Sequence, residues 1–451
     1  MIASKAPMMW QLRASIVATL SLLALGAGGC AEDPFDFGEP RSCDVADQNE
    51  WVYGLMQDAY LWSTELPEID PADYDSPAET ITALRVPPDR WSRVSDKVKT
   101  QQLFEEGKLI GLGFRTRRDA NGILTVSWVS ADSSASAAGM ARGDEVRTIG
   151  GFTIAQIDTD DRWDDVYGDD EPGVRVDVEF SRAGAAPTRA RLEKQWLEIE
   201  TIPVHQVLNV DGRPTGYLLF GTFVDTAAER LDAVFDEFVE AGVDRVIVDL
   251  RYNGGGRIAI ARQLVDLLVG DVADGATNYV VDYGPTLDDQ DSTRDVSRRD
   301  GSIRAPKAVV FITTGSTLSA SELVINAVRP HLDTFVVGDV TGGKPVGSHQ
   351  WEFCDKVAQP ITFRLLNAER SGDYFEGIEP DCFEADDLTR EVGDVSEALL
   401  AHALHLLGTG ECQPAPTLPP GREGEGVAGD GARGLLPPPV HDDVEGARGL
   451  F

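Results

Sequence analysis

The spacing of apolar residues changes along the chain. Within residues 50–62 it is helical, with apolar side chains at Trp51, Leu55, Met56, Tyr60 and Leu61. This helix begins a small helical region that extends to about residue 98. From about residue 109 the pattern is strand-like, in the runs 110–114, 123–126 and 174–178. We therefore expect a helical domain over residues 46–100 and a strand-rich domain over residues 101–197.

The longest patterned segment alternates strands with helices. Helical spacing covers residues 227–241, 257–269 and 319–328, and apolar runs typical of strands cover residues 245–250, 308–313 and 334–337. Such alternation predicts an α/β sheet with helical crossovers. A third domain, an α/β core over residues 198–412, follows. The predicted fold class is therefore a multidomain α/β protein.

The N-terminus has the pattern of an export signal. Lys5 and Arg13 precede an apolar run over residues 14–25, and small residues then lead to Cys30. Residues 1–29 resemble a bacterial lipoprotein signal, although Ala27 stands where that signal usually has Leu. The resemblance implies an exported protein of the cell envelope, anchored to a membrane through a lipid on Cys30, with residues 30–45 as a tether. The alternative is a chance thiol beside an ordinary cleavage site.

The charge composition limits which classes of partner the protein can bind. Acidic residues outnumber basic ones by 76 to 40, for a formal net charge of -36. Because polyanions are bound through Lys and Arg, nucleic acid is excluded as a partner. After Cys412 the chain becomes rich in Pro, Gly and charge, so residues 413–451 are predicted to be disordered. Within them residues 431–436 are nearly repeated by residues 446–451, as a low-complexity duplication or as a docking tag.

Four cysteines remain once Cys30 is assigned to lipid. An even number in an exported chain indicates two disulfides, and four cysteines permit three pairings. We expect Cys354 to pair with Cys382, and Cys43 with Cys412, so that the second bond joins the ends of the folded part. No pair has CxxC spacing, and the acidic stretches 158–165 and 288–295 lack the glycine and glutamate of an EF-hand loop. No metal and no cofactor are therefore expected.

A serine stands where a strand meets a helix. Ser319 follows the apolar run 308–313 and opens the helical segment 319–328, at the positive end of the helix. Glu322 lies three residues later, so a capping box explains the serine without catalysis. Taken alone, this pattern favours capping.

Two further segments favour a catalytic serine. Gly254, Gly255 and Gly256 follow the apolar strand 245–250, where their backbone N–H groups can hold an oxyanion. Lys344 follows two glycines in a near match to a phosphate-binding loop, but Pro345 replaces the required Ser or Thr. Burial can keep such a lysine neutral, and a neutral lysine can act as the general base of a serine.

Together these segments resemble the carboxyl-terminal processing peptidases, tail-specific serine peptidases that use a Ser/Lys dyad. The resemblance covers about residues 46–407 and includes Ser319 in Ser-Ala-Ser-Glu, Lys344 25 residues later, the glycine-rich segment 248–256 and the Gly-Ile-Glu-Pro-Asp turn at 377–381. It implies a crotonase-like α/β peptidase core in which Ser319 is the nucleophile and Lys344 the base. It also implies an oxyanion site made by backbone N–H groups of Gly255, Gly256 and Ala320.

The strand-rich domain is similar to the PDZ module of that family. Its carboxylate-binding loop would be Gly111, Leu112, Gly113 and Phe114. Residues 139–144 resemble a turn found further along such domains. The resemblance implies that this loop receives the terminal carboxylate of a peptide, which adds to the domain as a strand.

One departure leaves a catalytic role open. Many members of the family have a glutamine four residues beyond the lysine, and here that position is Ser348. Candidates for the third role are Ser348, His349, Gln350 and Glu322. The resemblance implies a serine endopeptidase whose partners are proteins or peptides with exposed C-termini. The alternative, supported by the missing glutamine, is an inactive peptidase-like receptor that binds peptides at the cell envelope.

Overall fold

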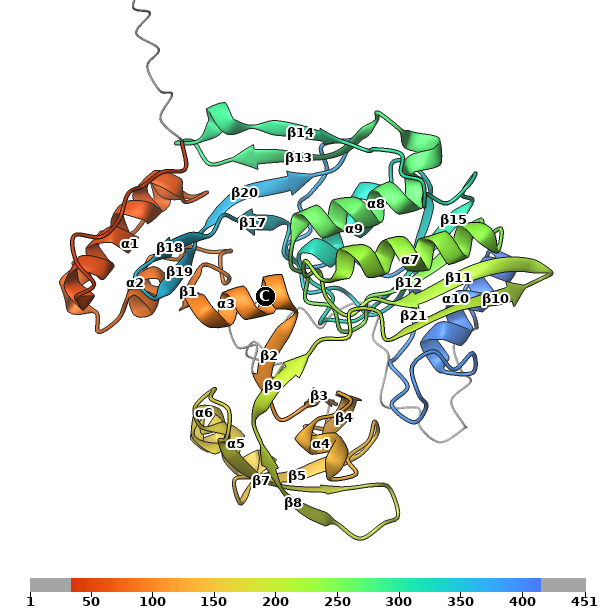
Figure 1. The fold of residues 1–451 in the computed structure, drawn as a ribbon, viewed down its shortest axis with the longest axis horizontal. Coiled ribbons are helices and arrows are strands. Elements are labelled where there is room, and N and C mark those ends of the chain that lie inside the picture. The colour runs from red at the N-terminus through yellow and green to blue at the C-terminus, as the bar shows by residue number, and fades with distance from the viewer. Residues whose placement is uncertain (1–33, 120, 415–451) are drawn as a thin grey trace, which may run out of the picture. The chain divides into compact units, whose positions relative to one another are not determined.

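The computed structural model describes residues 34–119 and 121–414 (Figure 1). The described residues of the unit that ends at Gly38 contain no helix or strand, and the elements below belong to the unit that begins at Glu39. None of the described helices combines the length and the apolar character needed to cross a membrane. The predictions for residues 1–29, for Cys30 and for residues 415–451 lie outside the described residues.

The first folded segment is mostly helical. Its elements are α1 (Val45–Ala59), η1 (Ser63–Glu65), η2 (Pro71–Asp73), α2 (Pro77–Ala83), β1 (Arg93–Asp96) and α3 (Lys97–Glu106). The helix expected over residues 50–62 is present, but it begins five residues earlier and ends where Tyr60 adopts an extended conformation. Strand β1 pairs with β19 (Lys356–Gln359), which pairs with β18 (Trp351–Phe353). This three-stranded sheet brings residues 93–96 beside a segment near the end of the chain.

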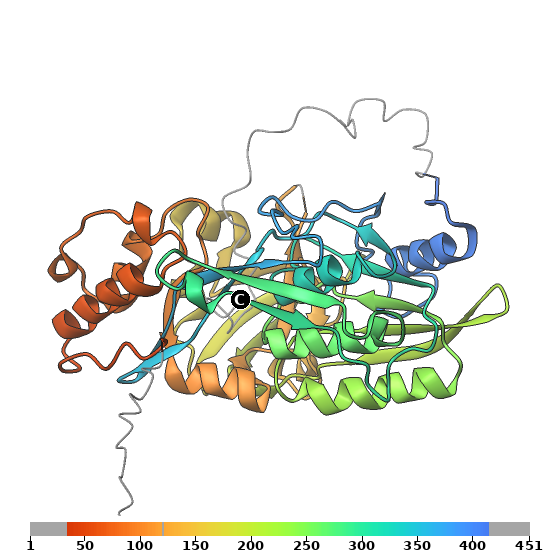
Figure 2. The ribbon, with the colours of Figure 1, turned by 90° about the horizontal axis from the view of Figure 1, so that it is seen from above.

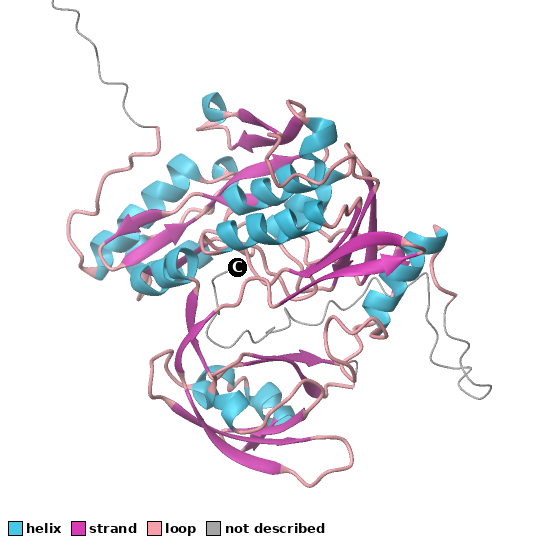
Figure 3. Cartoon of the chain, turned by 45° about the vertical axis from the view of Figure 1, so that its right-hand side comes forward, coloured by secondary structure: helices cyan, strands magenta, loops and turns pink. Residues whose placement is uncertain are grey.

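The strand-rich segment forms its own core. Its elements are β2 (Lys108–Gly111), β3 (Phe114–Arg118), β4 (Leu124–Val129), α4 (Ser134–Ala137), β5 (Glu145–Ile149), β6 (Phe152–Thr153), α5 (Ile154–Asp160), α6 (Trp163–Tyr167), β7 (Arg175–Ser181), β8 (Thr188–Glu193) and β9 (Gln195–Glu198). The main sheet has the order β3-β4-β5-β7-β8, and β2 pairs separately with β9 (Figure 3). Alternate residues of β7 face the core, as the period of two in a half-buried strand requires.

The third segment is built on a six-stranded sheet of order β10-β11-β12-β15-β16-β21. Its strands are β10 (Val204–Val210), β11 (Arg213–Leu219), β12 (Arg245–Asp249), β15 (Ala308–Thr313), β16 (Asp333–Gly338) and β21 (Cys382–Phe383), and its helices are α7 (Ala227–Glu240), α8 (Ile258–Ala273), α9 (Ala320–Val328) and α10 (Ala398–Thr409). In this sheet β11, β12, β15, β16 and β21 run parallel to one another, as the alternation in the sequence predicts, and β10 is antiparallel to β11.

Helices cover both faces of this sheet. Val246 and Val248 of β12 pack in the core that contains α7, α8 and α9, whereas Ile247 packs in the core that contains α10. Figure 2 shows α7 and α10 on opposite sides of the strands. Because both faces are covered, all five residues of β12 are buried, which explains its continuous apolar run.

A second sheet of this segment has the order β14-β13-β20-β17 and is antiparallel. Its elements are β13 (Thr277–Tyr283), η3 (Asp288–Gln290), β14 (Ser292–Asp295), β17 (Val346–Ser348) and β20 (Ile361–Leu366). Strand β17 begins two residues after Lys344. This sheet therefore positions the loop that carries the lysine.

The predicted disulfide pairing was wrong. Cys43 is bonded to Cys354, and Cys382 is bonded to Cys412. Cys354 lies in the turn between β18 and β19, and pairing of β19 with β1 brings this turn to the N-terminal segment. Cys382 lies in β21, next to the chain that leaves α10. The pairing thus follows from strand contacts that the cysteine spacing does not encode.

Candidate active site

Ser319 lies in a strained turn between β15 and α9. Its φ angle is +58°, in the region that residues with a side chain rarely adopt. The residue is the N-cap of α9, and its backbone N–H donates a hydrogen bond of 2.8 Å to Glu322 Oε2. The capping box expected from the sequence is present. Capping therefore coexists with exposure of the serine to a cavity, and does not exclude a chemical role.

The glycine loop lies directly against the serine. Gly255 has a φ angle of +104°, and a Cβ atom on it would lie 2.8 Å from Ser319 Cβ. The side chain of Asn253 shapes the loop, because its Oδ1 accepts a hydrogen bond of 2.9 Å from Gly255 N–H. One of the three expected oxyanion donors is thus already bonded within the loop. Gly256 and Ala320 are the two whose N–H groups have no hydrogen-bond acceptor among the described residues.

Lys344 is buried beside this loop. Its side chain is only 7% exposed. Burial lowers the pKa of the lysine to about 7, and the positive charge of Arg93 adds to the effect, against opposing contributions from Asp89 and Glu322. The lysine is therefore poised to be neutral near physiological pH, which is the property that a general base needs.

Glu322 connects the serine loop to the lysine loop. Besides Ser319 N–H, its carboxylate accepts hydrogen bonds from Gly343 N–H at 2.7 Å, Lys344 N–H at 2.8 Å and Thr341 Oγ1 at 2.5 Å. The carboxylate is fully buried, and burial raises its pKa against these hydrogen bonds. Of the candidates for a third role, Glu322 is a structural connector and does not line the cavity.

Ser319 and Lys344 line one cavity of about 260 Å³. Its other lining residues include the three remaining candidates and the glycine loop: Gly254, Gly256, Ser348, His349 and Gln350. The structure thus brings together residues from the three motifs that the sequence singled out.

His349 and Gln350 already have partners in this cavity. His349 Nε2 lies 2.8 Å from the hydroxyl of Tyr283, and burial lowers the pKa of the imidazole. Gln350 Oε1 accepts a hydrogen bond of 3.4 Å from Arg257 Nη1. Ser348 lies in β17 and pairs with Ile361 of β20.

Several cavity residues were not found from the sequence. Arg93 and Gln359 lie opposite each other in the β1–β19 pair, and both line the cavity. Arg257 at the start of α8 and Phe104 of α3 also line it, and the guanidinium carbon of Arg257 lies 4.8 Å from the centre of the Phe104 ring. No local motif marks these residues, because the strand pairing and helix packing that gather them join distant segments.

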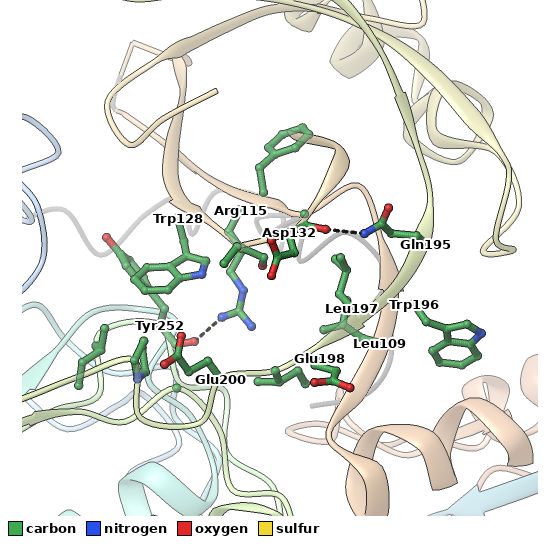
Figure 4. Close-up of a pocket in the computed structure, with 18 of the residues that line it drawn as sticks. Leu109, Arg115, Trp128, Asp132, Gln195, Trp196, Leu197, Glu198, Glu200 and Tyr252 are labelled. Carbon is green, nitrogen blue, oxygen red and sulfur yellow. Dashed lines mark hydrogen bonds between the residues drawn. The ribbon is translucent and has the colours of Figure 1, made fainter. Parts of the chain in front are cut away.

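The residues of the expected carboxylate-binding loop have different environments. Gly111 ends β2, Leu112 is fully buried, and Gly113 and Phe114 line a larger cavity of about 640 Å³ (Figure 4). Gly113 has a φ angle of +93°, and any Cβ atom there would overlap the side chain of Ser133. The loop therefore requires glycine at this position.

The larger cavity extends to Tyr252, in the segment that leads into the glycine loop. Figure 4 shows Tyr252 beside Trp128 with Arg115 reaching toward it, and Gln195 and Trp196 on the other side of the view. Arg115 Nη1 donates a hydrogen bond of 2.9 Å to the carbonyl oxygen of Tyr252, which directly precedes Asn253 and the glycines. The strand-rich segment and the glycine loop are thus in direct contact.

One group of side chains has the composition of a metal site. The ligand atoms of Cys382, His402 and Cys412 lie within 4.8 Å of one another, and no other such group occurs in the part of the chain that the structure describes. The two sulfur atoms form a disulfide, so they are not available as thiolates. The expectation of no metal stays a prediction.

Comparisons with known proteins agree with these motifs. The model of Peptidase family S41 matches residues 214–383, and that of the Peptidase S41 N-terminal domain matches residues 47–93. Carboxy-terminal processing protease CtpA of Bacillus subtilis is 23% identical over 271 residues, which are 60% of this chain and 55% of CtpA. CtpB of the same organism is 23% identical over 374 residues, 81% of this chain and 74% of CtpB.

The fold has a relative among solved structures. A crystal structure of an S41 protease from Bacteroides fragilis matches with a TM-score of 0.61 and 20% identity, over 79% of this chain and 96% of that chain. This supports a mixed α/β multidomain fold of the S41 type. The chain spans little more than half the length of CtpA. By these matches residues 214–383 belong to peptidase family S41, and the chain is a homologue of the carboxyl-terminal processing proteases.

Proposed function

We propose that this protein is a serine endopeptidase in which Ser319 is the nucleophile and Lys344 the general base. The observation that carries the proposal is that Ser319, a buried lysine with a pKa of about 7 and the glycine loop all line one cavity. Membership of residues 214–383 in family S41 gives independent support.

In the first step, neutral Lys344 accepts the proton of the Ser319 hydroxyl as the oxygen attacks the scissile carbonyl carbon. Protonated Lys344 then returns this proton to the leaving amine, and an acyl-enzyme remains. In the second step, water gives a proton to Lys344 and attacks the ester, which releases the acid product and regenerates the serine. No cofactor takes part in this sequence.

The oxyanion of each tetrahedral intermediate needs preorganised donors. The N–H groups of Gly256 and Ala320 are suited to this role, because both are adjacent to Ser319 or its loop and neither has an acceptor among the described residues. Gly254 also lines the cavity. The N–H of Gly255 contributes differently, since its bond to Asn253 Oδ1 maintains the loop conformation. Each oxyanion donor typically contributes about 3 to 4 kcal/mol.

The strand-rich segment is proposed to be a PDZ domain that binds the C-termini of substrate proteins. Gly113 and Phe114 line the larger cavity, and residues 195–198 of β9, which pairs only with β2, form another wall. An extended peptide could add to such an edge through its backbone. Contact between Arg115 and Tyr252 then connects the peptide site to the glycine loop.

Export and anchoring are proposed from the sequence alone. The apolar run before Cys30 supports a lipid-anchored protein of the cell envelope. Two disulfides are compatible with an oxidising compartment. Replacement of Cys30 by Ser should release the protein from membranes, and an unchanged membrane fraction would contradict the anchor.

The test of the catalytic proposal compares the purified protein with its Ser319→Ala and Lys344→Ala variants on casein, an unfolded protein. Cleavage by the parent and none by either folded variant would support the proposal. Binding of casein fragments without cleavage by the parent would instead support the inactive receptor, and cleavage by Ser319→Ala would overturn the assignment of the nucleophile.

A further inference from the structure

The catalytic cavity has an unusual charge for this chain. Among its lining residues are Arg93, Arg257 and Lys344, and none of the residues that line it is Asp or Glu. The protein as a whole has 76 acidic and 40 basic residues. A cavity whose described lining has two arginines and no carboxylate therefore differs from the acidic composition of the whole chain.

Arg93 is the cation in this cavity that lacks a countercharge. No ion pair or hydrogen bond joins its guanidinium to another described residue, and its Nε is buried without a partner. Burial lowers the pKa of Arg93 to about 9, with a further contribution from Arg85. Arg257 differs, because Asp225 lies 3.6 Å from its Nε and Gln350 accepts from its Nη1.

The neighbouring carboxylates, those of Asp89 and Glu322, already accept hydrogen bonds from other residues. Asp89 accepts hydrogen bonds from the Tyr60 hydroxyl at 2.9 Å and from the N–H groups of Trp91 and Ser92 at 2.8 and 3.0 Å. Glu322 accepts four hydrogen bonds from the serine and lysine loops. Neither side chain lines the cavity. The residues that the structure describes thus supply no hydrogen bond or ion pair to the guanidinium of Arg93.

Gln359 adds a second unsatisfied polar group at the same place. It lies opposite Arg93 in the β1–β19 pair, is 2% exposed, and its Oε1 is buried without a hydrogen-bond partner. The two ends of an amide can exchange by rotation, so Gln359 can offer a donor or an acceptor to the cavity. An amide and a guanidinium side by side form a site for a planar anion.

Arg93 is half-buried, with its Nε fully buried and unpaired. Leaving such a group unpaired costs free energy, and a ligand with the opposite charge recovers it. A carboxylate matches the guanidinium fork of arginine, with two parallel hydrogen bonds. We propose that the catalytic cavity selects substrates that carry a carboxylate close to the bond that is cut, and that Arg93 binds this carboxylate with Gln359 beside it. This inference rests on the proposed function of the cavity.

The carboxylate has two sources in a peptide. It is either the side chain of Asp or Glu or the free C-terminus. In both cases the bound anion offsets the positive charge that lowers the pKa of Lys344. The midpoint of the pH–activity profile should therefore lie at a higher pH for the anionic substrate than for its neutral analogue.

The test uses the full protein and peptides that span the bonds it cuts in casein. Each peptide is made in three forms: with its acidic residues, with these replaced by Gln or Asn, and with an amidated C-terminus. We expect a preference of about tenfold or more in kcat/KM for one carboxylate form, the usual effect of a charge-assisted hydrogen bond. Loss of the preference on side-chain replacement identifies a side chain as the source, and loss on amidation identifies the C-terminus.

The variants separate recognition from folding. Arg93→Met should abolish the preference, and Arg93→Lys, which keeps the charge but not the fork, should retain part of it. Arg213→Met is the matched control, because Arg213 is exposed at the start of β11, the end of the strand away from the glycine loop. The Arg213→Met variant should show the same preference for the carboxylate form as the parent protein.

Equal kcat/KM for all three peptide forms would overturn the inference, as would an unchanged preference in Arg93→Met. Peptide affinity for Ser319→Ala, measured by fluorescence anisotropy, gives the same comparison without turnover. Inactivity of Ser319→Ala together with equal use of all peptides would leave the catalytic proposal standing and refute only the role of Arg93. Full activity of Ser319→Ala would refute the catalytic proposal instead.

Discussion

The carboxylate of Glu322 accepts a hydrogen bond of 2.8 Å from the backbone N–H of Lys344, and with the same oxygen one of 2.8 Å from Ser319 N–H. One buried side chain thereby holds the loop of the proposed nucleophile against the loop of the proposed base. The relative position of the two loops therefore depends on this carboxylate.

Replacement of Glu322 by Gln should therefore reduce both stability and activity. The amide keeps one acceptor oxygen, and its NH₂ group faces backbone donors that it cannot satisfy. We expect a loss of about 3 kcal/mol in the free energy of unfolding, measured in urea. Glu379→Gln, at an exposed position of the Gly-Ile-Glu-Pro-Asp turn, is the control and should be neutral. Equal stability of the two variants would show that Glu322 does not connect the loops.

The activity of the protein should rise with pH. A base with a pKa of about 7 is protonated and inactive below that pH, and neutral above it. The profile of kcat/KM should therefore follow one ionisation near pH 7 and level off above it. Arg93→Met should move the midpoint upward on a neutral peptide, since Arg93 is one cause of the lowered pKa. A profile that is flat from pH 5 to pH 10 would exclude Lys344 as the base.

The same lysine should make the protein less stable at neutral pH. Its pKa is about 7 in the folded state, against 10.5 for a solvated lysine of the unfolded chain. Between these values the unfolded state binds more protons, so stability rises with pH from about 7 to about 10.5. The lysine's destabilising effect is fully present below pH 7 and is relieved above pH 10.5.

Lys344→Met removes this effect. The variant should be inactive and more stable than the parent at pH 7, and the difference should shrink by about 4 kcal/mol by pH 10.5. Lys307→Met, at an exposed position, should show no such pH dependence. A Lys344→Met variant that follows the stability curve of the parent would show that the lysine is not desolvated.

Gly255→Ala should abolish activity. The φ angle of +104° is unfavourable for alanine, and the new Cβ would lie 2.8 Å from Ser319 Cβ and 2.9 Å from Ala320 N. Either the loop or the serine must move, and a shift of about 1 Å typically costs about 100-fold in rate. The control is Gly54→Ala in α1, where a Cβ meets open space. That change should raise stability by about 1 kcal/mol and leave kcat/KM unchanged.

The sequence predicted the core elements, and it singled out the three segments whose residues line the smaller cavity, because both have local signatures. Buried parallel strands such as β12 are continuous apolar runs, and α7 buries Leu231, Val234, Phe235 and Phe238 at helical spacing. Ser319, Lys344 and the glycines come together because each follows a strand of the six-stranded sheet, and the three strands end on the same side of that sheet. In these cases a few neighbouring residues determine the conformation.

Features that depend on contacts between distant segments were not predicted. Arg93 meets Gln359 only because β1 pairs with β19, and the same pairing selects Cys354 as the partner of Cys43. The hydrogen bond from Gly255 N–H to Asn253 was missed for another reason. It depends on the rotamer of one side chain, which neither periodicity nor a motif determines.

Arg142 connects the strand-rich segment to the core. Its side chain is almost fully buried and donates hydrogen bonds to Asp386 Oδ1 at 2.7 Å and to the Tyr252 hydroxyl at 2.5 Å. Asp386 also accepts from Arg251 at 3.0 Å, and the two arginines keep its pKa low although burial alone would raise it. Arg142 therefore joins the proposed PDZ domain to the residues that directly precede the glycine loop.

Arg142→Met would leave Asp386 with Arg251 and with Arg117, whose Nη1 lies 3.6 Å from Asp386 Oδ2, and would leave Tyr252 without this donor. We expect a loss of about 3 kcal/mol in stability and a fall in kcat on folded protein, because the segment before the glycine loop is released. Arg191→Met is the matched control: Arg191 lies in the same segment and pairs with Asp177 at 2.7 Å, but the two side chains are 65% and 59% exposed. An exposed pair contributes at most about 1 kcal/mol, so thermal unfolding and kcat of this variant should be close to those of the parent. If the two variants behave alike, Arg142 does not couple the domains, and the contacts of Arg115 with Tyr252 and of Arg117 with Asp386 are the next to test.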